Sequence, residues 1–389
     1  MPKDLIYLDH NATTPVDPRV LEEMLPYFTD IYGNAASVDH EFGLEAKQAV
    51  DKARKQIAKA INAYPDEIIF TSGATESDNI ALFGVAEKYA KKGNHIITCV
   101  TEHKAILDAC KHLEEQGVEI TYLPVDQYGL VDLEALKKAI RKETILVSIM
   151  AANNEIGTLA PLEEIGKITR EHGLLFHSDA AQALGHIPLD VQKMNIDLLS
   201  MSAHKVYGPK GVGALYRRRS NPRVRLSPVI YGGGHEKGLR SGTLNVPGIV
   251  GFGKAVEIGV ASMQAEGAQY REWTTYMFEE LKKHLEEVHL NGHPTLRLPN
   301  NLNVSIPGIE SRALIVQLEN IAISTGSACT SAVVEPSHVI MELGFGEKRA
   351  HSSIRIGIGR FNSKTKIEQA AKKIIYRISS LRFQFSKKN

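Results

Sequence analysis

The chain has 389 residues, enough for two or three domains and for a sizeable hydrophobic core. Hydrophobic residues make up 43% of it and charged residues 23%, proportions typical of a globular protein, which excludes disordered and fibrous classes. Lys and Arg (46) nearly balance Asp and Glu (45), so the net charge of +1 gives no overall attraction to nucleic acid or anionic lipid.

The N-terminus, MPKDLIYLDHNATT (1–14), lacks the charged-then-apolar pattern of a secretion signal. No stretch of the chain approaches the roughly 18 apolar residues of a membrane span. We therefore expect a cytoplasmic protein with no membrane partner.

Seven short apolar runs follow one another between residues 67 and 217, with helical patterns between them. Most of these runs lack an alternation of period two, as expected for strands covered on both faces. The arrangement predicts an α/β fold with a mostly parallel seven-stranded sheet flanked by helices. The predicted strands are residues 67–70, 95–100, 118–125, 144–152, 174–180, 197–203 and 211–217, and the predicted helices are residues 76–91, 105–116, 133–141 and 162–172.

The pattern changes after the glycine-rich stretch GGGHEKGLRSGTLN (232–245). A long helical run over about 246–288 leads to more widely spaced elements, which is typical of an α+β domain. We expect a large domain over residues 15–260 and a small domain made of residues 1–14 and 261–389. The elements predicted in this part are strands at 302–306, 321–325 and 353–359, a helix at 312–320 and a last helix from about Lys364.

The segment EIIFTSGATESDN (67–79) reads as a strand, a turn of small residues and a helix that starts near Thr75. The N-terminus of a helix offers backbone N–H groups and the positive end of its dipole, and small residues let a phosphate approach them. Gly73, Ala74 and Thr75 are therefore a candidate phosphate cradle. A capped helix entry without a ligand is the more frequent use of such a turn.

Polar residues follow two of the predicted strands of this sheet. Asp179 lies at the end of one strand, followed by Gln182, and the next strand runs into Ser202, His204 and Lys205. A lysine in a crevice at a strand end can lose its proton and attack an aldehyde. Lys210 competes for this role, and an ordinary surface lysine is the alternative for both.

Three cysteines are too few for a disulfide framework in a chain of this length, and they lack the spacing of a zinc site. Cys99 and Cys110 fall in a predicted strand and a predicted helix, where buried, inert thiols are expected. Cys329 lies among small and polar residues (323–339) that cannot pack a core well, so we expect it on an exposed loop. An exposed thiol is the one able to react as thiolate.

None of the 15 histidines forms a metal-ligand spacing, so we expect no metal site. His103, directly after a predicted strand, is interpreted as a residue of the crevice. Arg240, Ser241 and Thr243 in the glycine-rich stretch suit anion binding, with a flexible loop as the equal alternative.

Taken together, the motifs resemble the PLP-dependent cysteine desulfurases of the NifS/IscS type, in the fold-type I aminotransferase superfamily. The resemblance covers nearly the whole chain and includes the long-loop form of the segment around Cys329. The motifs occur in the order of the family: YLDHNATTPVDPRV (7–20), SGATESDN (72–79), TEHKAIL (101–107), NNEIGTLAP (153–161), SDAAQALG (178–185), SAHKVYGPKG (202–211), RSGTLN (240–245), STGSACTS (324–331) and HSSIRIGIGRF (351–361).

The resemblance implies a role for each matching residue. Lys205 attaches pyridoxal 5'-phosphate (PLP) covalently, Asp179 pairs with its pyridine nitrogen, and His103 stacks on its ring. Arg355 and Asn154 bind the substrate, the first through its carboxylate. Further cofactor contacts are implied for Ala74, Thr75, Asn154, Gln182, Ser202, His204 and, from a second subunit, Thr243.

The implied reaction is the conversion of L-cysteine to L-alanine, with Lys205 or His103 as base and transfer of the sulfur to Cys329 as a persulfide. The implied partners are a second copy of the chain, in a homodimer, and a protein that accepts the sulfur. That acceptor stays open among an iron–sulfur scaffold, a tRNA-thiolation relay and a DNA-modification pathway. An aminotransferase or selenocysteine lyase reaction, or a non-catalytic partner protein, is the alternative on this fold.

Overall fold

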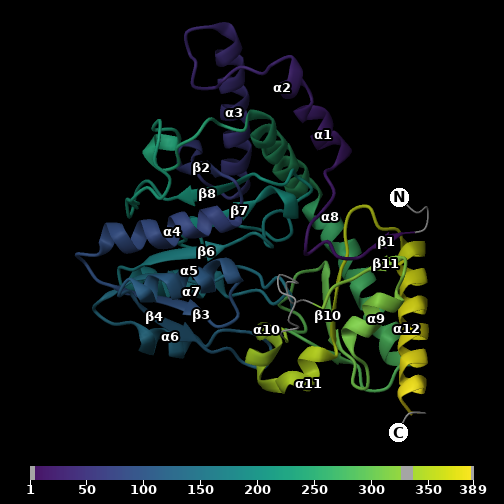
Figure 1. The fold of residues 1–389 in the computed structure, drawn as a ribbon. Helices are drawn as coiled ribbons and strands as arrows, with labels where there is room; N and C mark the ends of the chain where they lie inside the picture. The colour runs from purple at the N-terminus through teal and green to yellow at the C-terminus, as the bar shows by residue number, and fades with distance from the viewer. Residues whose placement is uncertain (1–4, 326–335, 387–389) are drawn as a thin grey trace.

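The structure is a computed structural model that describes residues 5–325 and 336–386 of the chain. The candidate sulfur acceptor Cys329 lies outside these residues. A large sheet with helices on both sides makes up the part that includes α4 to α7, and smaller sheets lie beside the long helix α12 (Lys364–Ser386) (Figure 1).

The large sheet has seven strands, and all seven runs predicted from the sequence take part in it. Every neighbouring pair is parallel except those made by β8 (Gly213–Arg217), which runs antiparallel to both of its neighbours. The predicted α/β fold with a mostly parallel seven-stranded sheet is confirmed. In spatial order the strands are β2 (Ile68–Thr71), β8, β7 (Leu198–Ser202), β6 (Leu175–Asp179), β5 (Thr144–Ser148), β3 (His95–Cys99) and β4 (Glu119–Leu123).

Helices bury both faces of this sheet, which explains why its inner strands are apolar without alternation. On one face Ile69, Ile96 and Leu215 belong to a buried cluster with α4 (Ala74–Tyr89) and α5 (Lys104–Glu115). On the other face, a second cluster joins residues such as Phe70 and Phe176 to a second set of helices. That set is α3 (Glu41–Ala60), α6 (Leu133–Ala139), α7 (Leu162–Glu171) and α8 (Val246–His284).

The N-terminal helices were not predicted from the sequence. α3 is a 20-residue helix whose buried residues include Ala46, Ala49, Val50, Ala53 and Ile57. This spacing of three and four gives the helix one apolar stripe, which packs beside α8. Two shorter helices, α1 (Pro18–Met24) and α2 (Pro26–Thr29), precede it.

A separate hydrophobic cluster forms around the smaller sheets. It includes Ile6 and Leu8 from the start of the chain, together with Tyr270 and Leu281 of α8 and Ile374 of α12. The elements of this part are the antiparallel strands β12 (Ser353–Gly357), β10 (Asn301–Ser305) and β9 (His289–Leu290), the parallel pair β1 (Ile6–Tyr7) and β11 (Ile321–Ala322), and the helices α9 (Ser311–Gln317), α10 (His338–Ile340), α11 (Gly346–His351) and α12.

β11 is shorter than the predicted strand 321–325, and the reason lies in its backbone partners. Its two residues pair with β1, whereas Ser324 exchanges backbone hydrogen bonds with Arg355 of β12 at 3.1 and 2.6 Å. The segment therefore crosses from one small sheet toward the other.

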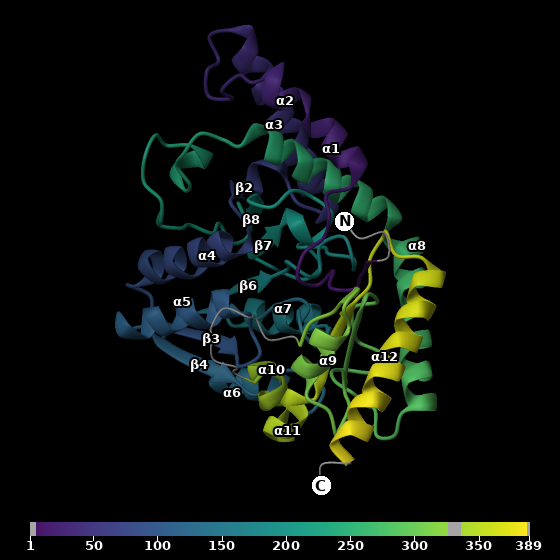
Figure 2. The same cartoon turned by 45° about the vertical axis from the view of Figure 1, so that its right-hand side comes forward.

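α8 is the one helix of the described residues that is long and apolar enough to cross a membrane by length and composition. The prediction that no stretch of the chain reaches that length of apolar sequence is therefore wrong. In the structure 56% of the apolar window is buried, and α8 packs along α3 (Figures 1 and 2). Burial against its own chain accounts for the apolar residues of this helix.

Candidate active site

A cavity of about 930 Å³ lies at the carboxyl ends of the strands in the large sheet. Sheets of this kind bind ligands at that edge, because the helix N-termini and the loops that follow the strands converge there. The cavity is also bordered by the N-terminal segment and by residues of α9 and β12. Of the predicted site residues that the structure describes, all line it except Thr243. Cys329 lies outside the described residues.

The turn between β2 and α4 forms one wall of the cavity. Gly73 caps the helix with φ +156°, a conformation that residues with a Cβ rarely adopt. Gly213 of β8 lies so close that a Cβ there would come within 2.6 Å of the Gly73 Cα. Ala74 and Thr75 then form the first turn of a 16-residue helix, and both line the cavity.

Lys205 follows β7 and reaches back to the N-terminal segment. Its Nζ donates hydrogen bonds to the carbonyl oxygens of Asn11 at 2.6 Å and Ala12 at 2.8 Å. Burial, reinforced by the positive charge of Arg355, lowers the pKa of Lys205 to about 8, although nearby carboxylates oppose the shift. The neutral amine is therefore accessible near neutral pH, as a nucleophilic lysine requires.

Asp179 ends β6 and is only 6% exposed. Its carboxylate accepts a hydrogen bond from the backbone N–H of Ala181 at 2.8 Å. Burial raises the pKa of Asp179, while that hydrogen bond and the charges of His103 and Lys205 act in the opposite direction. A buried carboxyl of this kind is stabilised as the anion by a cationic partner inside the cavity.

His103 caps α5, where its Nδ1 accepts a hydrogen bond from the backbone N–H of Ala105. Burial lowers the pKa of His103, and the charge of Lys205 adds to this shift. Burial likewise lowers the pKa of His204 to about 4, so both rings are neutral near pH 7. His204 also has its Nδ1 at 3.0 Å from the Thr13 hydroxyl.

The amides and the serine of the predicted site are fixed by buried contacts. Gln182 donates to the carbonyl of Asn11 at 2.8 Å and accepts from the Asn11 side chain at 3.3 Å. Ser202 ends β7 and is buried beside Gly73, since a Cβ at Gly73 would lie 3.9 Å from its hydroxyl. Asn154 lines the cavity, and its backbone carbonyl accepts a hydrogen bond from Arg355.

Arg355 lies on β12 and is 5% exposed. Its guanidinium donates to the Asp9 carboxylate at 2.9 Å and to the carbonyl of Asn154 at 3.0 Å. Its Nε is buried and has no hydrogen-bond partner among the residues that the structure describes. A planar guanidinium with a spare donor at a cavity wall suits the binding of a carboxylate.

The remaining predicted residues lie apart from the cavity or have other partners. Thr243 is exposed and does not line the cavity. Arg240 pairs with Glu76 at 2.8 Å, so its charge is already balanced within the chain. Cys99 and Cys110 are buried free thiols, and burial raises the pKa of both, to about 11 and about 12. The prediction that these two thiols are buried is confirmed.

Lys210 also lines the cavity, but it is exposed, unlike Lys205. Its ammonium keeps its contact with water, whereas burial lowers the pKa of Lys205.

The sequence reasoning missed several acids of the site. Asp9 pairs with Arg355, and it belongs to the N-terminal motif LDHNA (8–12). Asp78 and Glu102 are fully buried, and burial raises the pKa of both, with the charge of Asp179 adding to the shift. Neither carboxylate oxygen of Asp78 has a hydrogen-bond partner in the described part of the chain.

His177 lies beside this buried acid, with its Nε2 at 3.7 Å from the Asp78 Oδ1. Its two ring nitrogens contact the hydroxyls of Ser148 at 2.8 Å and Ser200 at 3.0 Å. Burial lowers the pKa of His177 to about 3, so the ring gives Asp78 no positive partner near neutral pH. Among the described residues, no cluster of three or more His, Cys, Asp or Glu forms a metal-binding group.

Residues 6–370 match the family described as aminotransferase class-V. The chain is 53% identical over 377 residues to the cysteine desulfurase IscS of Rickettsia rickettsii (strain Iowa), an alignment that covers 97% of this chain and 92% of the relative. A solved NifS-like protein superposes with a TM-score of 0.90 at 40% identity, over 96% of this chain and 99% of that one. Solved SspA in complex with cysteine superposes with a TM-score of 0.81 at 38% identity, over 92% and 100%. The chain belongs to the aminotransferase class-V family of PLP-dependent enzymes.

Proposed function

We propose that this chain is a cysteine desulfurase, which converts L-cysteine to L-alanine and transfers the sulfur to Cys329 as a persulfide. The observation that carries the proposal is a buried lysine with a lowered pKa, Lys205, in one cavity with Asp179 and Arg355. The names of the relatives support the choice of reaction, because one is a cysteine desulfurase and another was solved with cysteine bound.

The residues that line the cavity fit PLP. The start of α4, with Ala74 and Thr75, suits its phosphate, and Ser202 and His204 border the same wall. Asp179 is a buried acid that needs a cationic partner, which a protonated pyridine nitrogen provides. When bound, PLP supplies an aldehyde that a lysine amine can attack and a ring that stabilises negative charge next to the substrate Cα.

Lys205 and His103 are the bases available for the proton on the substrate Cα. Desolvation lowers the pKa of both groups, so each is neutral in a substantial fraction of molecules near pH 8. The carbonyls of Asn11 and Ala12 hold the Lys205 amine when it carries its proton. This contact keeps the amine at the cavity wall after a substrate amine has taken its place.

Arg355 orients the substrate by its carboxylate. Its unpartnered Nε can donate to that carboxylate, while Asp9 and the Asn154 carbonyl hold the other two nitrogens of the guanidinium. Asn154 lies next to it and completes this part of the cavity wall.

Cys329 receives the sulfur in this proposal. Its thiolate attacks the sulfur atom of the substrate, so that an S–S bond forms as the bond between that sulfur and the substrate Cβ breaks. The Cβ then takes up a proton and alanine is released. The persulfide passes to an acceptor protein of iron–sulfur cluster assembly or of a thiolation pathway.

The test measures alanine and sulfide released from L-cysteine in the presence of a thiol reductant. The Cys329→Ala variant should keep the yellow bound cofactor and yet release neither product. Lys205→Ala is the control that should lose the borohydride-trapped cofactor. Undiminished sulfide from Cys329→Ala would exclude the assigned role, and a keto acid formed by amine transfer would instead identify an aminotransferase.

We also propose a homodimer in which Thr243 of each chain completes the other's phosphate site. Large apolar side chains on α2 and on either side of it support this: Leu25, Phe28 and Tyr32 are 55%, 57% and 67% exposed. Exposed apolar side chains grouped in this way are typical of interfaces. A cytoplasmic, membrane-free enzyme is proposed as well, because a catalytic thiol and the unpaired Cys99 and Cys110 suit a reducing compartment.

Residues 15–260 are proposed as the PLP-binding domain, and residues 1–14 with 261–389 as a small domain that carries the Cys329 segment. The two separate hydrophobic clusters support this division, since Ile6 and Leu8 belong to the same cluster as Tyr270 and Ile374. Leu298 is an exception, because it packs in the cluster of the large sheet.

A further inference from the structure

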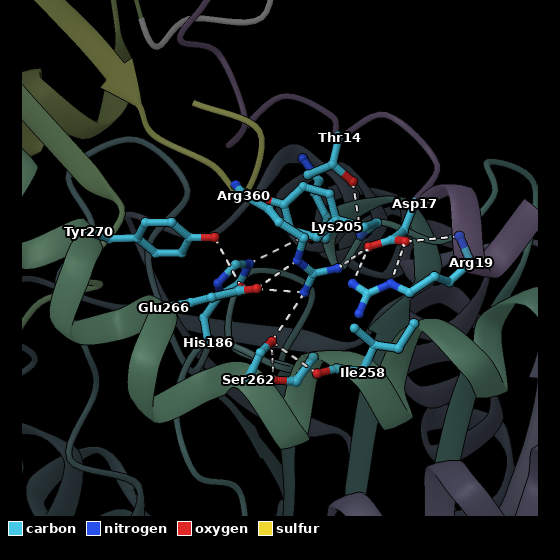
Figure 3. A network of polar contacts seen from close by, with 12 residues as sticks. Thr14, Asp17, Arg19, His186, Lys205, Ile258, Ser262, Glu266, Tyr270 and Arg360 are labelled. Atoms are coloured by element: carbon cyan, nitrogen blue, oxygen red, sulfur yellow. Dashed lines mark hydrogen bonds and ion pairs between the residues drawn. The ribbon is translucent and has the colours of Figure 1, made fainter. Parts of the chain in front are cut away.

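A buried charge network centred on Arg360 lies behind the candidate active site (Figure 3). The guanidinium contacts the Asp17 carboxylate at 2.8 Å and the Glu266 carboxylate at 2.6 Å, and it reaches the Ser262 hydroxyl at 3.3 Å. Its side chain is 9% exposed and that of Asp17 only 2%. Arg360 therefore ties the N-terminal segment to α8 from a position just after β12.

Tyr207 connects this network to the turn that carries Lys205. The Arg360 guanidinium lies 4.2 Å from the centre of the Tyr207 ring, and the Arg360 backbone N–H donates to the Tyr207 hydroxyl at 2.6 Å. Tyr207 has φ +65°, the left-handed conformation, only two residues after Lys205. An aromatic residue keeps that conformation only where its surroundings impose it.

The N-terminal segment holds the same turn from the other side. Thr14 donates through its N–H and its hydroxyl to the carbonyl of His204, at 3.0 and 2.9 Å. The N–H of Tyr207 donates in turn to the Thr14 hydroxyl, and the N–H of Asp17 donates to the Tyr207 carbonyl. The N-terminal segment therefore has two contacts of interest. The carbonyls of Asn11 and Ala12 accept hydrogen bonds from the Lys205 amine, and a few residues later Asp17 binds Arg360.

We propose that Arg360 is a positioning residue for Lys205, acting through Asp17 and Tyr207. It fixes the strained turn after Lys205 and the N-terminal carbonyls that hold the lysine amine, and so sets where that amine meets the cofactor. This inference rests on the proposed attachment of the cofactor to Lys205.

A purely structural ion pair is the alternative, and the geometry distinguishes the two. A buried pair by itself is weak evidence for stability, because desolvation opposes its attraction. Arg360 does more than neutralise two acids: its ring contact and its backbone hydrogen bond both fall on Tyr207. Arg19 already pairs with Asp17 at 2.7 Å, so charge neutralisation of that acid does not depend on Arg360 alone.

The experiment compares Arg360→Gln and Tyr207→Phe with the wild-type holoenzyme. Tyr207→Phe removes only the hydroxyl that accepts from Arg360, so it is the milder variant where Arg360→Gln folds poorly. Arg218→Gln is the control, since Arg218 forms a comparably buried pair with Asp197 (3.0 Å) at the opposite end of β7.

The readouts are the dissociation constant for PLP, the visible circular dichroism per bound cofactor, and the fraction of Lys205 trapped by borohydride and identified by mass spectrometry. Both network variants should bind PLP roughly 2- to 30-fold more weakly, the range for coupling through a packed network. Their circular dichroism per bound cofactor should fall because the ring is less rigidly oriented. Arg218→Gln should match wild type in all of these.

Wild-type affinity and circular dichroism in Tyr207→Phe and in any folded Arg360→Gln would overturn the inference. An equal loss in Arg218→Gln would also overturn it, because general destabilisation would then explain the effect. Failure of the proposed function is recognised separately: in that case borohydride traps no cofactor on Lys205 even in the wild-type protein.

Discussion

The amine of Lys205 changes its chemistry within the physiological pH range. A lysine whose pKa is lowered from 10.5 to about 8 is protonated below pH 8 and neutral above it. The rate at which the cofactor-free protein captures PLP should therefore rise as pH increases through about 8 and then level off. Below that pH it should fall about tenfold per pH unit, as the neutral fraction does.

The measurement is the rate of borohydride-trapped cofactor on Lys205 between pH 6 and 10. Lys210→Ala serves as the control, because Lys210 lines the same cavity but is exposed. It should leave the midpoint near pH 8. A midpoint above pH 10 in the wild-type protein would contradict the assigned environment of Lys205.

Asp78 gives a second prediction at the scale of a residue. Burial raises its pKa well above 3.8, so the folded chain keeps a proton that the unfolded chain releases. The contribution of this carboxyl to the free energy of unfolding is fully present below about pH 4. It is lost as pH rises toward the pKa of the folded state. Asp78→Asn removes that pH dependence. The difference in stability between this variant and wild type should therefore favour the variant more at pH 8 than at pH 5.

Urea midpoints of the cofactor-free proteins at the two pH values check this prediction. Asp108→Asn is a suitable control, since Asp108 lies on α5 and its side chain is exposed. An identical difference between Asp78→Asn and wild type at both pH values would show that the carboxyl is ionised when folded.

Sequence reasoning located Lys205 and Asp179 because each follows a recognisable apolar strand, and strand ends meet at one edge of a parallel sheet. It missed Asp78, whose burial depends on how α4 packs over that sheet. It also missed Asp9, which meets Arg355 from the opposite end of the chain. Contacts between residues this far apart in sequence carry no local pattern.

The turn into α4 gives a prediction at the scale of an element. Gly73→Ala would place a Cβ only 3.9 Å from the Ser202 hydroxyl, which is ordinary contact, so the cost arises from the φ of +156°. Such a conformation costs about 1–3 kcal/mol outside glycine. The free energy of unfolding should fall by about that amount, and PLP affinity should fall as the turn shifts.

Gly117→Ala is the matched control, since Gly117 also has a positive φ (+87°) and a Cβ there meets nothing within 4 Å. It should lower the free energy of unfolding, measured in urea, without changing PLP affinity. Unchanged affinity in Gly73→Ala would remove this turn from the proposed phosphate site.

The seven strands of the large sheet were predictable because doubly covered strands are short, continuous apolar runs separated by turns. The end of β11 was not, because Ser324 leaves β1 for a backbone partner, Arg355, that is remote in sequence. α1, α2 and α3 also escaped prediction, and the small residues of the buried stripe of α3 give a weak apolar signal.

The proposed dimer is tested at the scale of the whole molecule. Phe28→Asp places a charge in the exposed apolar patch near α1 and should shift the protein from dimer to monomer in sedimentation velocity. PLP affinity should fall with it, because the monomer lacks Thr243 of the other subunit. Tyr376→Asp is the control, since Tyr376 is 67% exposed on α12. A wild-type monomer would contradict the proposal.

α8 runs without interruption for 39 residues, a length of about 58 Å at the usual helical rise. Val256 near its start packs with the large sheet, whereas Met277 near its end packs with the small ones. A hinge between the two parts would have to bend a continuous helix. We therefore expect substrate to enter through movement of short segments at the cavity rim, where Arg312 and Val316 of α9 lie, rather than through rotation of one half against the other.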